Sequence, residues 1–436
     1  MPDILTMITE KDRLDFSQNY GVRRNYDGDT EFPDMKTQYL EAEYYRLSDS
    51  LQLPTAAMVH ALNSEARTGT RPTAEKVTIE KLLIKEKINQ DERVMLLSNR
   101  GVSGTEALQR YIFDDMTRLA ESVKTRTEVA KQELLSTGKV TVKENNLDLS
   151  MDYGVPAENF YTLDWNDPDH DILGDIQGMV NYARSIGKNP VRAKTSTATL
   201  MKMQKNNGIQ KAINGVYMVG ALLTPTTIGN LMAQMFGFIL KVNDNVYAYP
   251  NADGTKSSKR YFDQNKFALY TVGINGAVGT GLWGETSEER EYGQYSAKSA
   301  QQFITITQWA EKDPPAVWTK ASGLFIPVLP DPYGLFIATV SQDTLGALTV
   351  TSAAGTTSGT TKVTVLPALT SGNSYKYKTG SSLTVPTFNQ LISGGYTNWD
   401  GAADITATTG NSVLIVEVDS TGKAKKAGQA TVTAKV

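Results

Sequence analysis

The chain has 436 residues, with 44 basic and 47 acidic side chains and a formal net charge of −3. At about 150 residues per domain, this length predicts two or three domains. The sequence contains no cysteine and only two histidines, His60 and His170. It therefore excludes disulfides, thiolate nucleophiles and cysteine zinc sites, and it disfavours most enzyme classes. Nearly balanced charge also disfavours a broad electrostatic contact with nucleic acid.

The sequence shows no export or membrane signal. Met1–Leu5 contains an acidic residue and precedes no long apolar stretch, so no signal peptide is predicted. The most apolar window, Ala221–Leu240, is interrupted by Pro225, Asn230 and Gln234 and does not predict a membrane span. We expect a soluble protein made inside the cell, with no membrane partner.

The first 341 residues predict a mixed α+β fold. Glu75–Ile88 alternates like a strand and changes phase at Leu82, which predicts a bulge or strong twist. Thr105–Ser136 carries apolar residues at three- and four-residue steps and predicts a long spine helix that stops at Gly138. Val140–Met151 has the pattern of a hairpin.

A second helix is predicted to start at Asp167 and Pro168, with Asp as the N-cap and Pro at the first helical position. Asp167–Asp171 also imitates the start of a calcium loop. Ile172 and Gly178 replace the Gly and Glu that such a loop needs, so the acidic segment is better explained as the start of the helix. The predicted buried stripe of this helix is Ile172, Ile176, Met179, Ala183 and Ile186.

Two further motifs suggest chemistry. Gly279–Gly284 fits the G-x-G-x-x-G pattern of dinucleotide sites, but the acidic segment Glu285–Glu291 after it would repel a pyrophosphate. A glycine-rich turn is the better interpretation. A Ser/His/Asp triad would need His60 or His170, but no serine lies in a nucleophile elbow. We expect no catalytic, cofactor-binding or metal-binding residues, and no enzyme.

The region from 67 to 87 is locally basic, with acidic residues interleaved and no interleaved aromatic residues. This pattern favours pairing with a neighbouring protein surface over contact with phosphates. The candidate subunit-contact residues are Arg67, Arg71, Lys76, Lys81 and Lys85.

The composition changes at Asp343 to Thr, Ser, Gly, Ala and Val with short β-branched runs, which predicts a separate all-β sandwich over 342–436. Val413–Val418 and Gln429–Ala434, joined through the turn Asp419–Gly422, predict a terminal hairpin. Seven lysines and five acidic residues give this segment a charge of +2, which leaves −5 for the rest.

Several short segments, taken in order, resemble the lambda-type major capsid proteins of tailed double-stranded DNA phages, the capsid protein E family. The resemblance spans most of residues 1–341. The segments that carry it are Phe32-Pro33, Thr127–Val142, Phe267–Tyr270 leading to Gly281-Leu282, and Trp318–Pro332.

This resemblance implies the Hong Kong 97-type capsid fold. It also implies homo-hexamers and pentamers of an icosahedral shell around packaged double-stranded DNA, without enzyme activity or a cofactor. The regions it implies are an N-arm (1–31), an E-loop (32–91), a peripheral domain with the spine helix (92–165 and 285–341) and an axial domain (166–284).

Residues 342–436 resemble bacterial and phage immunoglobulin-like modules of the Big-2 type, through Val416–Ala424 and Ala427–Thr433. In capsid proteins such modules are displayed on the outer shell, where they bind surface glycans or decorate the lattice. The resemblance further implies a scaffold protein, a portal and a decoration protein as partners. It implies a location in the virion capsid after assembly in the host bacterial cytoplasm.

Three other functions fit parts of the pattern. An encapsulin-like nanocompartment would share the shell fold, but the Ig-like tail and the closing run at 318–332 favour a virus. A secreted adhesion or surface-layer protein would explain the Ig-like module, but Met1–Lys11 offers no export signal. An enzyme that depends on His170 or Asp171 comes third.

Overall fold

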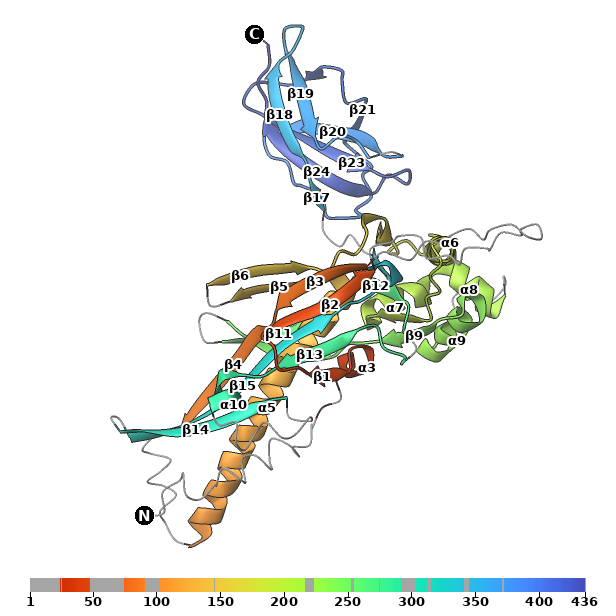
Figure 1. Ribbon diagram of the computed structural model, residues 1–436. Coiled ribbons are helices and arrows are strands. Elements are labelled where there is room, and N and C mark those ends of the chain that lie inside the picture. The colour runs from red at the N-terminus through yellow and green to blue at the C-terminus, as the bar shows by residue number, and fades with distance from the viewer. Residues whose placement is uncertain are drawn as a thin grey trace, which may run out of the picture. The chain divides into compact units, whose positions relative to one another are not determined.

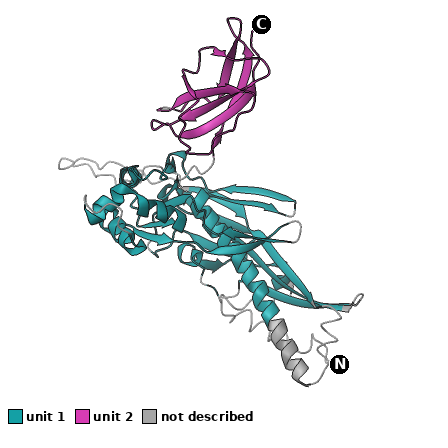
Figure 2. Cartoon of the chain, turned by 180° about the vertical axis from the view of Figure 1, so that it is seen from behind, with its two compact units in different colours: residues 1–340 teal, residues 341–436 magenta. Residues whose placement is uncertain are grey.

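The chain divides into two compact units, residues 1–340 and 341–436 (Figure 2). Unit 1 mixes helices and strands and unit 2 is built from strands, so the predicted fold class is confirmed. The computed structural model describes residues 24, 26–47, 74–90, 102–144, 146–215, 223–251, 255–273, 275–291, 303–312, 315–340, 345–370 and 372–435.

Unit 1 opens with α3 (Gly28–Glu31) and β1 (Asp34–Lys36). An antiparallel hairpin follows, made of β2 (Glu41–Leu47) and β3 (Ala74–Glu80). A single residue, Lys81, separates β3 from β4 (Leu82–Gln90), and β4 joins a different sheet. The single bulged strand predicted over 75–88 is therefore wrong. The phase change at Leu82 marks the point where the chain leaves one sheet and enters another.

The spine helix is confirmed as α5 (Val102–Thr137), the long helix that packs along β4 and β15 in Figure 1. It ends at Gly138, which has a φ of 71° and donates its N–H to the Leu134 carbonyl at 2.9 Å. The predicted hairpin follows as β5 (Lys139–Glu144) and β6 (Leu147–Asp152).

Two five-stranded sheets organise unit 1. The first has the order β1–β13–β15–β14 with β4 also paired to β15, and it packs on α5 around Phe32, Val123, Trp283 and Phe325. The second has the order β7–β16–β12–β8–β9. Their strands are β13 (Thr280–Gly284), β14 (Thr305–Lys312), β15 (Pro315–Val328), β7 (Phe160–Thr162), β8 (Arg192–Thr195), β9 (Ile239–Val242), β12 (Lys266–Tyr270) and β16 (Leu335–Thr339).

Four helices supply apolar faces to a core that they share with the second sheet. They are α6 (Ile172–Ser185), α7 (Thr197–Lys205), α8 (Asn207–Asn214) and α9 (Pro225–Phe236), the green helices of Figure 1. The remaining elements of unit 1 are η1 (Ala157–Asn159), the hairpin β10 (Val246–Pro250) and β11 (Lys256–Arg260), α10 (Ser287–Glu291) and η2 (Pro332–Gly334).

The predicted start of the second helix is wrong by four residues. The N-cap of α6 is Asp171, whose Oδ1 accepts from the Gly174 N–H at 2.9 Å. Asp167 instead closes a turn of its own, since its carbonyl accepts from the His170 N–H at 3.2 Å. Of the predicted stripe, only Ile186 lies beyond the helix, as its C-cap.

Unit 2 is a sandwich of two sheets, ordered β17–β24–β23–β20–β21 and β18–β19–β22. Its core includes Val363, Tyr375, Trp399 and Ile415. The turn at Asp419–Gly422 is confirmed, but β24 already starts at Ala424, five residues before the predicted strand. The strands are β17 (Gly346–Ala347), β18 (Thr349–Ala354), β19 (Thr360–Leu366), β20 (Ser374–Gly380), β21 (Thr397–Trp399), β22 (Ile405–Thr406), β23 (Ser412–Val418) and β24 (Ala424–Thr431).

Candidate functional site

The enzyme-like motifs have structural roles. Gly279 precedes β13, and a Cβ there would lie 2.0 Å from the Val328 carbonyl oxygen. The G-x-G-x-x-G segment is therefore a strand packed closely on β15, not a phosphate loop. His170 bonds through Nε2 to Asp175 Oδ2 at 2.7 Å, beside the α6 N-cap, and His60 lies outside the described residues.

Two other observations concern the described part of the chain. It contains no group of three or more histidine, aspartate or glutamate side chains suited to a metal ion. None of its helices combines the length and apolar character needed to cross a membrane.

Three of the five basic candidates, Lys76, Lys81 and Lys85, lie in the described part of the chain. Arg67 and Arg71 lie outside the described residues. Lys76 pairs with Glu43 at 2.9 Å and Lys85 with Glu288 at 2.9 Å, and 52% and 38% of these lysine side chains remain exposed. Lys81 is 3% exposed, so it serves its own chain instead.

Lys81 holds the junction between β3 and β4. Its ammonium donates to Thr37 Oγ1 at 2.7 Å, to the Tyr39 carbonyl, and to the Glu41 carbonyl at 3.4 Å. Burial lowers the pKa of Lys81 to about 8. Through these bonds, the side chain of Lys81 holds the junction between β3 and β4 against the segment that leads into β2.

A buried ion cluster fixes the segment that leads into the β2–β3 hairpin against the spine helix. Lys131, on α5, is fully buried and donates to Asp29 at 2.6 Å and to Asp34 at 2.7 Å. Lys124, two helical turns earlier on the same face of α5, also pairs with Asp34. Burial alone would lower the pKa of Lys131, but the two carboxylates raise it above its ordinary value.

A neighbouring buried pair extends this cluster to the second sheet. Lys194 on β8 lies 2.8 Å from Glu31 Oε1 and donates to Gln132 Oε1 at 3.2 Å. Gln132 donates to Glu128, which accepts from the Gly28 N–H at 3.0 Å. Burial lowers the pKa of Lys194 even though Glu31 favours its charged form.

The sequence analysis missed this cluster, although a signal was present. Lys124, Glu128 and Lys131 are spaced by four and three residues, so they form a second, charged stripe on α5 beside the apolar one. A charged stripe on an isolated helix is usually solvated. Here the segment 28–36 covers it.

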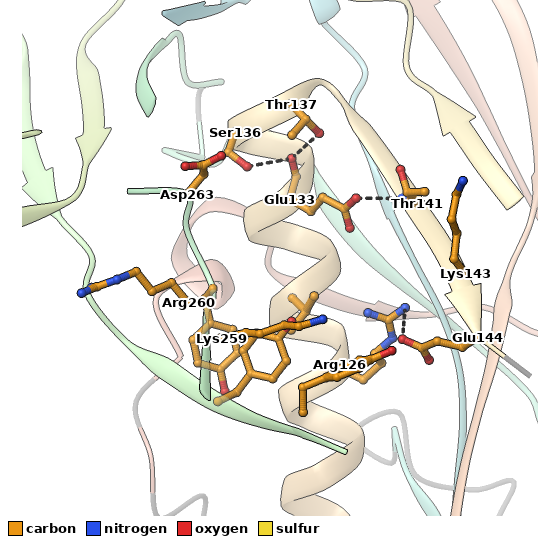
Figure 3. Close-up of a pocket in the computed structure, with 14 residues that line it drawn as sticks. Arg126, Glu133, Ser136, Thr137, Thr141, Lys143, Glu144, Lys259, Arg260 and Asp263 are labelled. Atoms are coloured by element: carbon orange, nitrogen blue, oxygen red, sulfur yellow. Dashed lines mark hydrogen bonds and ion pairs between the residues drawn. The ribbon is translucent and has the colours of Figure 1, made fainter. Parts of the chain in front are cut away.

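A groove of about 500 Å³ lies between α5, β5 and the β10–β11 hairpin (Figure 3). Its lining mixes basic and acidic side chains, and two of them, Arg126 and Glu144, pair at 3.4 Å. Lys259 lies 3.5 Å from the centre of the Tyr249 ring, and Glu133 accepts from the Thr141 N–H at 3.0 Å. Mixed, paired charges suit a protein surface better than an anionic ligand.

Residues 49–340 match the family model of phage major capsid protein E. The chain belongs to that family. It is therefore a phage major capsid protein, a subunit of an icosahedral shell located in the virion capsid, and the predicted identity is confirmed. The family role is structural rather than enzymatic.

Unit 2 has a separate likeness. Residues 353–435 match the model of the S-layer protein SbsC C-terminal domain. The Big-2 assignment stays a prediction. No curated protein matches the capsid chain.

Solved structures are similar to this chain, and the first of them shows the same fold. The putative capsid protein of a prophage of E. coli CFT073 is 16% identical with a TM-score of 0.51, and the match covers 76% of this chain and 99% of that one. A phage-related protein from Bordetella bronchiseptica RB50 is 11% identical, with a TM-score of 0.48 over 74% and 95%. The mature capsid of bacteriophage PhiM1 is 11% identical, with a TM-score of 0.39 over 74% and 90%.

Proposed function

We propose that unit 1 assembles into the hexamers and pentamers of the shell, and that unit 2 is an added module displayed on the outside. The observation that carries this proposal is that the family match and the first compact unit end at the same residue. The family match ends at residue 340, where unit 1 ends, and 99% of the prophage protein is covered by 76% of this chain. These boundaries support the proposal that residues 341–436 are an addition to the capsid subunit.

We propose an assignment of the E-loop, the peripheral domain and the axial domain to these elements. The β2–β3 hairpin lies in the proposed E-loop, α5 in the peripheral domain and α6–α9 in the axial domain. β16 falls in the stretch assigned to the peripheral domain, but it pairs with β12 of the second sheet. We therefore extend the axial domain to include residues 335–340.

The partners follow from this role. The shell would hold double-stranded DNA without sequence specificity, and the −5 charge of the shell segment favours containment over tight adhesion. Scaffold, portal and decoration proteins would bind it during assembly, which would take place in the host cytoplasm.

Electron microscopy of two purified forms, residues 1–436 and 1–340, tests the proposal. We expect shells or rings from both, and a C-terminal tag on the longer form that antibodies reach on intact particles. Absence of any assembly from either form, with or without a scaffold, would refute the shell function. A tag accessible only after disruption would refute outward display alone.

The S-layer likeness favours a surface-attachment role for unit 2. We propose a cell-surface glycan as its target. Isolated residues 341–436 should then bind purified bacterial cell walls, and prior removal of wall glycans should abolish the binding. Copurification of a cargo enzyme with the shells, in place of DNA, would instead favour an encapsulin-like compartment.

A further inference from the structure

The strands β4, β15 and β14 form a ribbon with two different faces. One face packs on the spine helix through Ile84, Ile88 and Ala321. Residues paired directly across an antiparallel ribbon share a face, and the face alternates along each strand. The register therefore places Trp309 beside Trp318, and Lys87 beside Lys320, all on the opposite face.

These four residues form a compact cluster, which we call the Trp–Lys patch. The rings of Trp309 and Trp318 are stacked, with centroids 6.3 Å apart and planes 14° apart. Lys87 lies 4.1 Å from the centre of Trp318, and Lys320 lies 5.7 Å from that of Trp309. Trp309 is 37% exposed, and tryptophan dominates binding hot spots in protein interfaces.

The chain covers the other half of this ribbon face itself. Ala42 and Ile79, from the inner face of the β2–β3 hairpin, pack on Leu282, Ile326 and Val328. The inner face of the hairpin is therefore occupied. Its outer face points away from that core, and the side chains on it between 41 and 45 and between 76 and 80 are exposed in the described part of the chain.

That outer face is acidic. It carries Glu41, Glu43, Glu80 and Tyr45, which we call the acidic face, together with Lys76. Tyr45 is 69% exposed. Glu41 and Glu80 are direct partners across the strand pair, and both are exposed. Like charges directly opposite each other destabilise a strand pair.

Unpaired charges thus occur on both surfaces. Among the described residues, Glu41, Glu80 and Lys87 have no ion-pair partner, and the Lys87 ammonium lies over the Trp318 ring. Lys320 differs, because it already pairs with Glu288 at 2.7 Å. A carboxylate brought to Lys87 would relieve the repulsion between the two glutamates. Tyr45 would supply an aromatic ring to the exposed Trp309 indole.

We propose that the acidic face of one copy docks on the Trp–Lys patch of a second copy. This inference rests on the proposed assembly into shells and names one of its contacts. The two surfaces differ, so the contact is head-to-tail, the type that closes into rings.

Charge reversal tests the contact in the full-length chain. We expect Lys87→Glu and Glu80→Lys each to raise the concentration needed for assembly about tenfold or more, as loss of a hot-spot charge contact does. The double variant should assemble again. An equimolar mixture of the two single variants should also form hexamers, because alternating copies restore each charge pair.

The controls separate misfolding from lost contact. Lys362→Glu, at an exposed position of unit 2, should assemble like the wild type. Unassembled single variants should keep the wild-type circular dichroism and melting temperature. A wild type that never assembles would refute the shell function itself. Normal assembly of Lys87→Glu, or failure of both the double variant and the mixture, would overturn this contact alone.

Discussion

Lys194 and Glu31 form an ion pair of 2.8 Å in which the side chains are 0% and 1% exposed. Glu31 belongs to α3, just before the β2–β3 hairpin, and Lys194 belongs to β8 of the second sheet. The pair therefore ties the end of the proposed N-arm, next to the proposed E-loop, to the proposed axial domain. Tyr270 also donates to Glu31, at 3.3 Å.

Removing one partner of this pair should be costly. Glu31→Gln leaves Lys194 as an uncompensated buried cation, so we expect a loss of about 3–5 kcal/mol in the free energy of unfolding. Glu31→Leu with Lys194→Met should recover most of that loss, since neither charge of this pair remains. Urea titration of the unassembled subunit measures both. Equal losses in the single and double variants would contradict the pairing.

Asp34 should govern part of the acid stability. Burial tends to raise the pKa of Asp34, but Lys131 and Lys124 lower it below its ordinary value. A carboxyl whose folded pKa is lowered contributes stability above its unfolded pKa of about 3.9, and that contribution is lost as pH falls through the folded pKa. Asp34→Asn should thus be less stable at pH 7 and lose less stability below about pH 4.

A matched control is Asp148→Asn, because Asp148 is 72% exposed and lies 3.5 Å from Lys143. Exposed pairs of this kind contribute between about 0 and 1 kcal/mol. Urea titrations at pH 7 and pH 3 compare the variants. A pH dependence in Asp34→Asn identical to that of the wild type would exclude this role.

Lys81 should add a pH dependence of the same sign on the alkaline side. Burial lowers its pKa to about 8, whereas an unfolded lysine titrates near 10.4. Between these values the unfolded chain binds more protons, so stability should rise with pH across the window. Lys81→Met should abolish the rise, and Lys139→Met, at a lysine 49% exposed, should keep it. Urea titrations at about pH 7.5 and pH 10, near the two pKa values, would measure how the stability of each variant changes with pH.

Gly279 should not tolerate a methyl group. A Cβ there meets the Val328 carbonyl oxygen at 2.0 Å and the Phe32 ring at 2.8 Å, so Gly279→Ala should cost about 1–3 kcal/mol through displaced backbone. Gly229, within α9, has open space around its Cβ position, and Gly229→Ala should gain up to about 1 kcal/mol. Thermal unfolding of both variants distinguishes close packing from a general intolerance of alanine.

Local patterns were sufficient for the long and strongly periodic elements. The apolar steps of α5 and the stop at Gly138 depend on residues close in sequence, and so does the β5–β6 hairpin. The change of composition near 342 likewise reflects a unit with its own core. Each of these features depends on residues that are close to one another in the sequence, so the sequence pattern alone predicts it.

Contacts between residues far apart in the sequence could not be predicted from it and are known only from the tertiary structure. The sequence placed Lys81 among surface lysines and treated α5 as an apolar stripe, because neither pattern shows which segment will cover a charge. The fold buries Lys81 under the entry to β2 and brings Asp29, Asp34 and Glu31 onto or near the charged stripe of α5. The cost of burying a charge depends on partners about a hundred residues away, and only the folded chain brings them within hydrogen-bond distance.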